Sequence, residues 1–436
     1  MRVTVIGCGY LGATHAAGMA ELGYEVVGLE NDPAKVAELS AGRVPFYEPD
    51  LEELLSQHVA SGSLRFTSSY AEAGAFGDVH FVCVGTPQEP HGLGADLSQV
   101  EGAVTGIAPY LRGDALVVGK STVPVGTAQR LLAMLEEHKA ESASPRLAWN
   151  PEFLREGFAV KDTLQPDRLV FGVTEPSAEA TLREVYAKVL ADGTPCVVTD
   201  LATAEMVKVS ANAFLATKIS FINAIAEMCE VAGADVWDLA EAIGHDARIG
   251  RKFLNAGIGF GGGCLPKDIR AFQHRAGELG VDHVTSLMRE VDAINLHRRE
   301  RVGLIAAEML GDVAGARVAV LGAAFKPDSD DVRDSPALAV AGQLHLAGAN
   351  VSVYDPKANA NAAKRFPTLT YADSALNACR DADLVLHLTE WPEFRALTPA
   401  DLDGVVRRKQ ILDGRNLLDA DRWREGGWTF RSMGRR

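Results

Sequence analysis

The stretch Arg2–Gly12, which reads RVTVIGCGYLG, decides the fold of this 436-residue chain. Its first five residues have the β-branched pattern of a buried parallel strand, and glycines follow directly at positions 7, 9 and 12. In such a turn the first glycine closes the bend, the second lets the backbone meet a pyrophosphate, and the third lets the next helix pack on the strand. The N-terminus of that helix adds partial positive charge. The stretch therefore favours a dinucleotide-binding α/β domain over a purely structural glycine turn.

The next strand pattern, residues 25–29, ends at Glu30, an acid at the spacing that holds the ribose hydroxyls of a bound adenosine. A carboxylate there repels a 2′-phosphate, and Asn31 offers no guanidinium in compensation. We therefore expect the cofactor to be NAD rather than NADP.

The composition restricts the class of protein and its partners. With 47% hydrophobic and 23% charged residues, the chain is typical of a globular enzyme of two or three domains. The net charge of −15 argues against nucleic acid and anionic membranes as main partners. We expect no signal peptide, no run of about eighteen apolar residues that could span a bilayer, and no metal site. Six scattered cysteines without a CxxC pair indicate a reducing cytoplasm.

Strand and helix patterns alternate over the first 200 residues, which predicts a parallel, doubly wound sheet. We expect its strands at 2–6, 25–29, 79–84, 115–119, 146–149, 168–173 and 196–199. The segment 202–232 then has apolar residues at helical spacing and no Pro or Gly. It predicts a helix of about 45 Å that joins two lobes and supplies a dimer face.

A second helical stretch covers about 284–310, and strand patterns restart after it at 317–321, 350–354 and 382–387. They repeat the N-terminal order, but the glycine turn at 322–327 lacks its second and third glycines. The sequence thus predicts two Rossmann-like doubly wound domains joined by a long central helix. The expected boundaries are 1–200 for the NAD-binding domain, 201–312 for a central helical dimerisation domain with the cysteine loop, and 313–436 for a C-terminal Rossmann-like domain adapted for another ligand.

Ligands of parallel sheets lie at the carboxyl ends of the strands, so we expect Thr86 and Thr122 beside the cofactor. On the long helix, Lys208 and Asn212 are four residues apart and share one side. The alternative for Lys208 is an ordinary solvated lysine.

The segment Gly259–Asp268, GFGGGCLPKD, presents one thiol after a run of glycines. Glycines permit close approach of a ligand, and a nearby cation such as Lys267 favours the nucleophilic thiolate. Cys264 is therefore a candidate nucleophile, with a small buried side chain as the alternative.

Together these motifs resemble the UDP-glucose/GDP-mannose dehydrogenase family along almost the whole chain. The resemblance rests on residues 7–12, 121–124, 150–157, Lys208 with Asn212, 259–268, and 325–327 leading to 331–333. It implies oxidation of UDP-glucose at C6 to UDP-glucuronate, in two hydride transfers that consume two NAD.

Family roles follow residue by residue. Lys208 would stabilise the oxyanion with a hydrogen bond from Asn212, and Asp268 would relay the proton through water. Cys264 would add to the aldehyde carbon, giving a thiohemiacetal and then a thioester.

Hydrolysis of that thioester would use Glu152 as base, with Thr122 placing the water. The alternative for Glu152, Arg155 and Glu156 is a local ion-pair cluster at the start of a helix.

The resemblance also implies the binding residues. Cofactor contacts would be Gly7, Gly9, Leu11, Gly12, Glu30, Lys35, Thr86, Thr122, Glu156, Lys267 and Arg333. Substrate contacts would be Glu152, Phe153, Leu154, Arg155, Glu156, Lys208, Asn212, Phe253, Leu254, Asn255, Ala256, Gly257, Gly261, Lys326 and Arg415. Arg248 resembles the arginine that this family lends to the neighbouring subunit's site, so we expect a homodimer.

Departures from the family pattern leave alternatives open. Gly263 stands where many members have serine, and Glu30 stands where aspartate is more usual. The tripeptide 264–266 also occurs in the GDP-mannose branch, so a GDP-mannose 6-dehydrogenase with the same chemistry is the main alternative. A single-step NAD-dependent hydroxyacid dehydrogenase would need no thiol, and a non-catalytic NAD-binding regulatory protein would need no reactive residues. We expect a cytoplasmic enzyme of nucleotide-sugar and polysaccharide biosynthesis.

Overall fold

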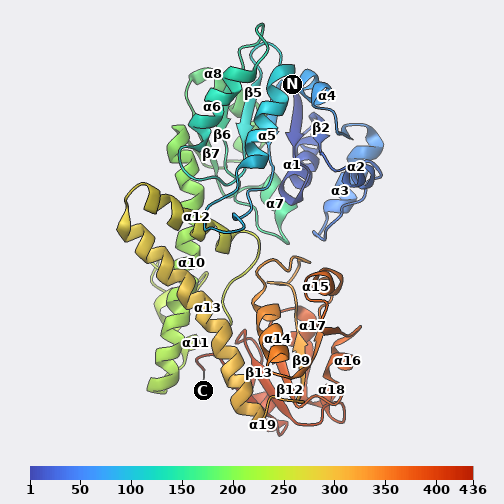
Figure 1. Ribbon diagram of the computed structural model, residues 1–436, viewed down its shortest axis with the longest axis vertical. Coiled ribbons are helices and arrows are strands. Elements are labelled where there is room, and N and C mark those ends of the chain that lie inside the picture. Colours follow the sequence, from blue (N-terminus) through green and yellow to red (C-terminus); the bar gives the residue numbers. More distant parts are fainter. Residues whose placement is uncertain (436) are drawn as a thin grey trace. The chain divides into compact units, whose positions relative to one another are not determined.

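The computed structural model describes residues 1–435 and divides the chain into two compact units, Met1–Ala211 and Asn212–Arg436. Each unit is built on a parallel-dominated sheet, and the long helix α10 (Leu201–Ala232) runs from the first unit into the second (Figure 1). The predicted fold class is thereby confirmed. The predicted boundaries at residues 200 and 312 stay a prediction.

The first unit has eight strands in the order β3-β2-β1-β4-β5-β6-β7-β8, all parallel to their neighbours except β6 and β7. Their bounds are β1 Arg2–Ile6, β2 Glu25–Leu29, β3 Leu64–Thr67, β4 Val79–Val82, β5 Leu116–Gly119, β6 Arg146–Trp149, β7 Leu169–Val173 and β8 Cys196–Thr199.

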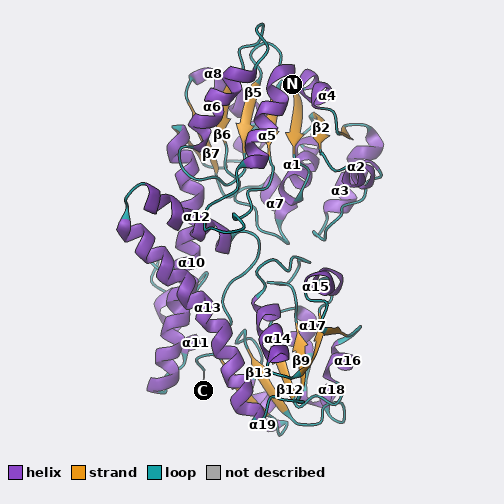
Figure 2. Ribbon diagram, in the orientation of Figure 1, coloured by secondary structure: helices purple, strands orange, loops and turns teal. Residues whose placement is uncertain are grey.

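Helices flank both faces of this sheet, as Figure 2 shows in purple beside the orange strands. They are α1 Tyr10–Glu21, α2 Pro33–Ser40, α3 Leu51–Ser61, α4 Tyr70–Phe76, α5 Ser98–Ile107, the 3₁₀ turn Ala108–Tyr110, α6 Thr127–His138, α7 Ala159–Leu164, α8 Pro176–Val185 and α9 Ala187–Ala191. Along β1, Val3 and Val5 enter one buried apolar cluster and Ile6 enters another. A strand buried on both faces reads as a continuous apolar run, which is why these strands show in the sequence.

The second unit begins within α10. Four longer helices and five short ones follow along the chain. They are α11 Val236–Gly244, α12 Leu265–Glu278, α13 Asp282–Leu310, α14 Pro336–Leu346, α15 Asn359–Arg365, α16 Ala375–Cys379, α17 Pro392–Ala396, α18 Pro399–Leu402 and α19 Ala420–Glu425.

Its sheet has six parallel strands in the order β11-β10-β9-β12-β13-β14. Their bounds are β9 Arg317–Leu321, β10 Asn350–Tyr354, β11 Thr370–Tyr371, β12 Leu384–His387, β13 Gln410–Asp413 and β14 Thr429–Ser432. Successive side chains of β9 alternate between two buried clusters, with Val318 and Val320 in one and Ala319 and Leu321 in the other. This sheet is therefore also covered on both faces.

Three expectations were wrong. The N-terminal sheet is not wholly parallel, because β7 runs against β6. Strands β3, β11, β13 and β14 lie outside the predicted set. We also expected no apolar run long enough to span a bilayer, but helix α10 is long and apolar enough by length and composition. A buried helix of a globular protein passes the same test.

Two glycines of the first unit differ in the space around them, and this predicts opposite effects of alanine substitution on stability. A β-carbon at Gly119 of β5 would lie 2.0 Å from the Trp149 ring of β6, whereas one at Gly102 of α5 would meet nothing within 4 Å. Gly119→Ala should lower the free energy of unfolding by about 3 kcal/mol through overpacking. Gly102→Ala should raise it by about 0.5–1 kcal/mol, because alanine favours a helix interior.

Thermal unfolding followed by circular dichroism measures both effects against wild type. An unchanged midpoint for Gly119→Ala would show that the β5–β6 packing is looser than described.

Candidate active site

The turn after β1 has the geometry that a dinucleotide requires. Gly7 has φ +85°, and a β-carbon at Gly12 would lie 1.7 Å from the Gly7 carbonyl oxygen, so α1 packs directly on the turn. A β-carbon at Gly9 would meet nothing within 4 Å, and α1 begins without a side-chain cap. Backbone N–H groups at an uncapped helix start suit a phosphate. Gly7, Gly9, Leu11 and Gly12 therefore fit the predicted cofactor.

Glu30 lies directly after β2 and holds the same turn. One carboxylate oxygen accepts a hydrogen bond from Cys8 N at 3.1 Å, and the other accepts from Asp32 N at 3.1 Å. Lys35, another predicted cofactor contact, is exposed on α2. The acid thus stands at the carboxyl end of the strand next to β1, where the ribose is expected.

The loops after β4 and β5 are joined by two hydroxyl groups. Thr86 donates to Thr122 O at 2.8 Å, and Ser121 donates to Val84 O at 2.7 Å. The structure therefore brings the two predicted threonines, Thr86 and Thr122, together at the carboxyl edge of the first sheet.

Glu152, in the loop after β6, meets Lys208 of α10 in an ion pair of 3.0 Å. Both side chains are largely buried, and Leu154 N donates to the same carboxylate at 2.5 Å. The Lys208 ammonium also lies 5.5 Å from the centroid of the Phe153 ring. The alternative of a solvated Lys208 is thereby wrong.

The rest of this loop is bonded to α7 and to the loop before α3. Arg155 forms an ion pair with Asp162 of α7 at 2.6 Å, which is the local pairing considered as its alternative role. Gly157 N and Ala159 N both donate to buried Glu48 at 2.7 Å, and the Tyr10 hydroxyl donates to it as well. Burial and the Glu48 contact raise the pKa of Tyr10.

Two buried acids of the first unit escaped the sequence analysis. Besides Glu48, Glu205 of α10 accepts from Gly126 N at 2.7 Å and Ala128 N at 2.6 Å, and so caps the start of α6. A glutamate three residues before Lys208 on an apolar helix is the signal that could have found Glu205. Nothing local distinguishes Glu48.

In the second unit, Asn212 of α10 donates to Asp268 of α12 at 2.6 Å. Lys267 pairs with the other Asp268 oxygen at 2.5 Å, and Asp268 is buried. A carboxylate held between an amide donor and an ammonium suits a proton relay.

Cys264 precedes α12 and is exposed. The glycines before it are required by close contacts. A β-carbon at Gly259 would lie 2.4 Å from Asn295 Oδ1, and one at Gly263 would lie 2.2 Å from the Arg333 guanidinium carbon. Gly259 and Gly262 also have φ of +97° and +86°. The alternative of a packed-away thiol is therefore wrong.

Two residues of α13 that the sequence analysis missed anchor this loop. Asn295 accepts from Phe260 N at 2.7 Å and donates to Phe260 O at 3.0 Å, and Arg299 donates to the same oxygen. Polar residues four apart on an otherwise buried helix face are the signal that could have found them.

The predicted substrate residues of the second unit fall into different environments. Leu254 and Ala256 are buried in an apolar cluster, so they offer backbone rather than side chain. Arg415 donates to Leu388 O, Gly259 O and Phe325 O, and thereby joins three loops.

Four more of the predicted substrate residues lie in the same loop region and differ in conformation and in bonding partner. Phe253 has φ +68°, Asn255 accepts from Arg251 at 2.8 Å, and Gly257 N donates to Asn223 at 2.8 Å. A β-carbon at Gly261 would lie 2.3 Å from Asp334 O.

Three basic residues complete the predicted binding residues of the second unit. Arg333 pairs with Asp331, Lys326 lies 5.6 Å from the Phe325 ring centroid, and Arg248 is 89% exposed and pairs with Asp246. Of the catalytic candidates, Glu152 pairs with Lys208 in the first unit, and Asn212 is bonded to Asp268 in the second. Thr122 follows β5, the strand next to β6, and Cys264 directly precedes α12, the helix that carries Asp268. Within residues 1–435, no cluster of three or more His, Cys, Asp or Glu side chains is placed to hold a metal ion.

The exposure of Cys264 predicts selective alkylation. The other five cysteines are buried or partly buried, and burial raises the pKa of the Cys83 and Cys379 thiols to about 12. Since the thiolate is the nucleophile, iodoacetamide at pH 7.5 should modify Cys264 first and partly buried Cys196 more slowly. Peptide mass spectrometry over a time course measures the order. Faster modification of any buried cysteine would contradict the described placement of the loop.

Known proteins share this arrangement across the whole chain. Profiles of the UDP-glucose/GDP-mannose dehydrogenase family match with their NAD binding domain at residues 1–190, central domain at 202–297 and UDP binding domain at 319–420. The UDP-glucose 6-dehydrogenase of Rhizobium meliloti is 42% identical over 440 residues, with 100% of both chains covered. UDP-glucose 6-dehydrogenase YwqF of Bacillus subtilis is 39% identical and covers 100% of this chain and 98% of its own.

Solved structures agree. A UDP-glucose dehydrogenase from Pyrobaculum islandicum superposes with a TM-score of 0.91 at 38% identity, covering 98% of each chain. A GDP-mannose dehydrogenase from Pseudomonas aeruginosa superposes with a TM-score of 0.54 at 27% identity, covering 99% of this chain and 100% of its own. The chain belongs to the UDP-glucose/GDP-mannose dehydrogenase family.

Proposed function

We propose that this protein oxidises UDP-glucose at C6 to UDP-glucuronate with two molecules of NAD. The observation that carries the proposal is an exposed Cys264 on a glycine loop, in a chain with full-length relatives named as UDP-glucose 6-dehydrogenases that are 38–42% identical. A cysteine nucleophile distinguishes four-electron oxidation from a single-step dehydrogenase. The lower similarity to a GDP-mannose dehydrogenase favours the uridine nucleotide.

The first oxidation removes a proton from the C6 hydroxyl and a hydride from C6, leaving an aldehyde. Asp268, held by Asn212 and Lys267, passes the proton to water. The Lys208 ammonium stabilises the alkoxide that forms before the hydride leaves. Bound NAD supplies the hydride acceptor, and the fingerprint turn at Gly7–Gly12 with Glu30 holds it.

The second oxidation first needs a new bond to the aldehyde carbon. That carbon carries a carbonyl oxygen and no hydroxyl group, so it cannot release a hydride until a nucleophile has added to it. The Cys264 thiolate adds to that carbon and gives the alkoxide form of a thiohemiacetal. As this alkoxide collapses to a thioester, the hydride on C6 would pass to the second NAD. Glu152 then takes a proton from water placed by Thr122. The water oxygen bonds to the acyl carbon as the C–S bond breaks, which releases the carboxylate and restores the thiol.

The ratio of NADH to sugar tests the reaction. Two NADH per limiting UDP-glucose are expected, together with UDP-glucuronate as product. Cys264→Ala should bind NAD with unchanged affinity and lose at least a thousandfold in uronate formation, because no covalent adduct forms. Two NADH per GDP-mannose would move the substrate, and one NADH per sugar would contradict the thioester route.

We further propose that the active form is a homodimer joined through α10. Phe214, Phe221 and Met228 are spaced by seven residues on that helix and are 49–66% exposed. A row of large apolar side chains at this spacing occupies one helix face and is typical of a helix–helix interface. Exposed Arg248 is free of burial in its own chain, as an arginine that serves a neighbouring site would be.

Charges in that row should separate the subunits. Phe214→Asp combined with Met228→Asp should give a monomer by analytical ultracentrifugation and abolish activity if the neighbouring Arg248 is needed. Leu346→Asp is the matched control, because Leu346 is 88% exposed on α14 and stands apart from the row. A double variant that remains dimeric would place the interface elsewhere.

Two broader expectations belong to the same proposal. Six free cysteines, with Cys264 required as a thiol, are consistent with a reducing cytoplasm. UDP-glucuronate is a building block for sugar polymers, which supports a role in polysaccharide biosynthesis.

A further inference from the structure

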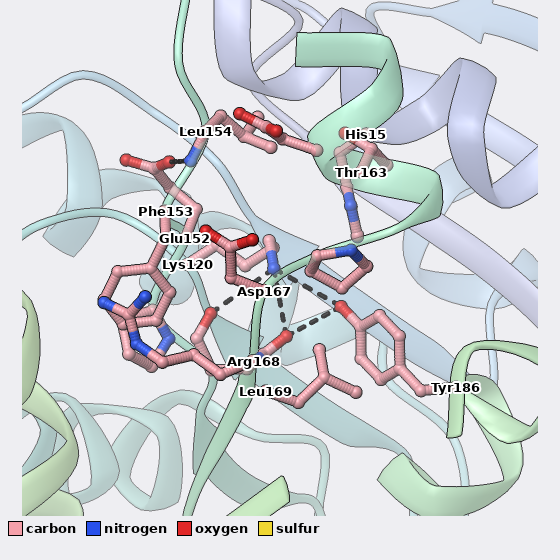
Figure 3. A pocket seen from close by; sticks show the side chains of 14 residues that line it. His15, Lys120, Glu152, Phe153, Leu154, Thr163, Asp167, Arg168, Leu169 and Tyr186 are labelled. Atoms are coloured by element: carbon pink, nitrogen blue, oxygen red, sulfur yellow. Dashed lines mark hydrogen bonds between the residues drawn. The ribbon is translucent and has the colours of Figure 1, made fainter. Parts of the chain in front are cut away.

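Behind the Glu152 loop lies a pocket whose buried lysine, Lys120, has no part in the proposed mechanism. Figure 3 shows it, with the Lys120 amine bonded to the Tyr186 hydroxyl and with Glu152, Phe153 and Leu154 among the other lining residues. The pocket is open on one side, and exposed Asp167 lies in its lining. It therefore connects a deeply buried amine to solvent within the first unit.

Lys120 is the residue before Ser121 and Thr122, and only 6% of it is exposed. Its ammonium donates to Asn150 Oδ1 at 3.0 Å, to Tyr186 Oη at 3.3 Å and to Asn150 O at 3.4 Å. These three bonds use all three protons that an ammonium carries. They are the dashed lines that meet at Lys120 in Figure 3.

The acceptors are themselves fixed. Tyr186 donates its hydroxyl proton to Asn150 Oδ1 at 2.7 Å, and Asn150 Nδ2 donates to Val170 O at 3.0 Å. The amide of Asn150 thus has one possible orientation. Since Asn150 precedes Pro151 and Glu152, the network joins the end of β5, which leads to Thr122, to the end of β6, which leads to Glu152.

Nearby ionisable groups act on the Lys120 ammonium in opposite directions. The Glu152 carboxylate attracts its ammonium, while Lys208 repels it. Burial lowers the pKa of Lys120 to about 8, so the ammonium remains protonated at pH 7. On the α1 side of the pocket, His15 is buried with no hydrogen-bond partner for Nε2 among the residues described, and burial and Lys120 lower its pKa. Burying an ammonium costs desolvation free energy, which its hydrogen bonds must offset. Because all three N–H groups are bonded, Lys120 fixes the positions of the groups that accept from it.

We propose that Lys120 is the positioning residue for the hydrolytic half of the reaction, holding the Thr122 and Glu152 segments in register with each other. The inference rests on the proposed function, because it needs a thioester to hydrolyse. In that step water adds its oxygen to the acyl carbon, the C–S bond breaks, one proton goes to Glu152 and the other returns to sulfur. The two hydride transfers depend on Lys208, Asn212, Cys264 and Asp268, so the loss of Lys120 should slow hydrolysis much more than it slows them.

Rapid-mixing kinetics at pH 7 separate the two halves in the full-length enzyme. Lys120→Ala should release two NADH per active site at a rate within threefold of wild type, and then hydrolyse at least tenfold more slowly. Mass spectrometry of the quenched enzyme should show an acylated Cys264 peptide that accumulates. Lys188→Met, which changes an exposed lysine of α9, is the control and should match wild type.

Two further measurements distinguish positioning from general loss of structure. Tyr186→Phe removes one acceptor and keeps the ring that packs on Phe171, so it should slow hydrolysis about threefold or more even if Lys120→Ala does not fold. Propylamine, which has the carbon and nitrogen atoms that Lys120→Ala removes, should restore hydrolysis in Lys120→Ala but not in Tyr186→Phe.

The proposal is overturned if Tyr186→Phe hydrolyses the thioester at the wild-type rate, or if Lys120→Ala slows the first hydride transfer as much as hydrolysis. Wild-type enzyme that releases one NADH per UDP-glucose would instead contradict the proposed function itself.

Discussion

Both sheets are covered by helices on their two faces, and the rest of the structure depends on this double coverage. A strand buried on both sides has no polar face, so side chains that do chemistry lie in the loops beyond the strand ends. In the first unit, β4, β5 and β6 are neighbours in the sheet and run in the same direction. Their loops therefore bring Thr86, Thr122 and Glu152 to one edge, although these residues are far apart in the sequence.

Loops at such an edge need partners for their backbone groups, and here buried charges provide many of them. Glu205 caps α6, Glu48 holds the start of α7, and Lys120 joins the ends of β5 and β6. Each is a charge whose burial is tolerated because hydrogen bonds replace the water it has lost. The consequence is that the loop carrying Glu152 is tied to the sheet, to α7 and to α10 at once, which keeps its carboxylate beside Lys208.

The elements that the sequence predicted well have strong local periodicity. Helix α10 was expected over 202–232 and extends over Leu201–Ala232, and β1 and β2 match their predicted bounds. Strands β3 and β11 were missed because they are short and partly exposed at sheet edges, so their side chains carry little apolar pattern. The reversed direction of β7 was missed for another reason: strand direction depends on how the chain returns to the sheet, which no local pattern records.

The sequence by itself determined the two glycine-rich turns and the thiol that follows the second of them, because a glycine's conformational freedom is a local property. Positive φ at Gly7, Gly259 and Gly262 needs no knowledge of distant residues. Only the tertiary structure decided which polar groups meet. Arg415, expected to contact substrate, donates to the carbonyl of Gly259, and Lys120 meets Asn150 across two strands. Such pairings depend on the register of the sheets and on the removal of water, which act on residues that the chain order keeps apart.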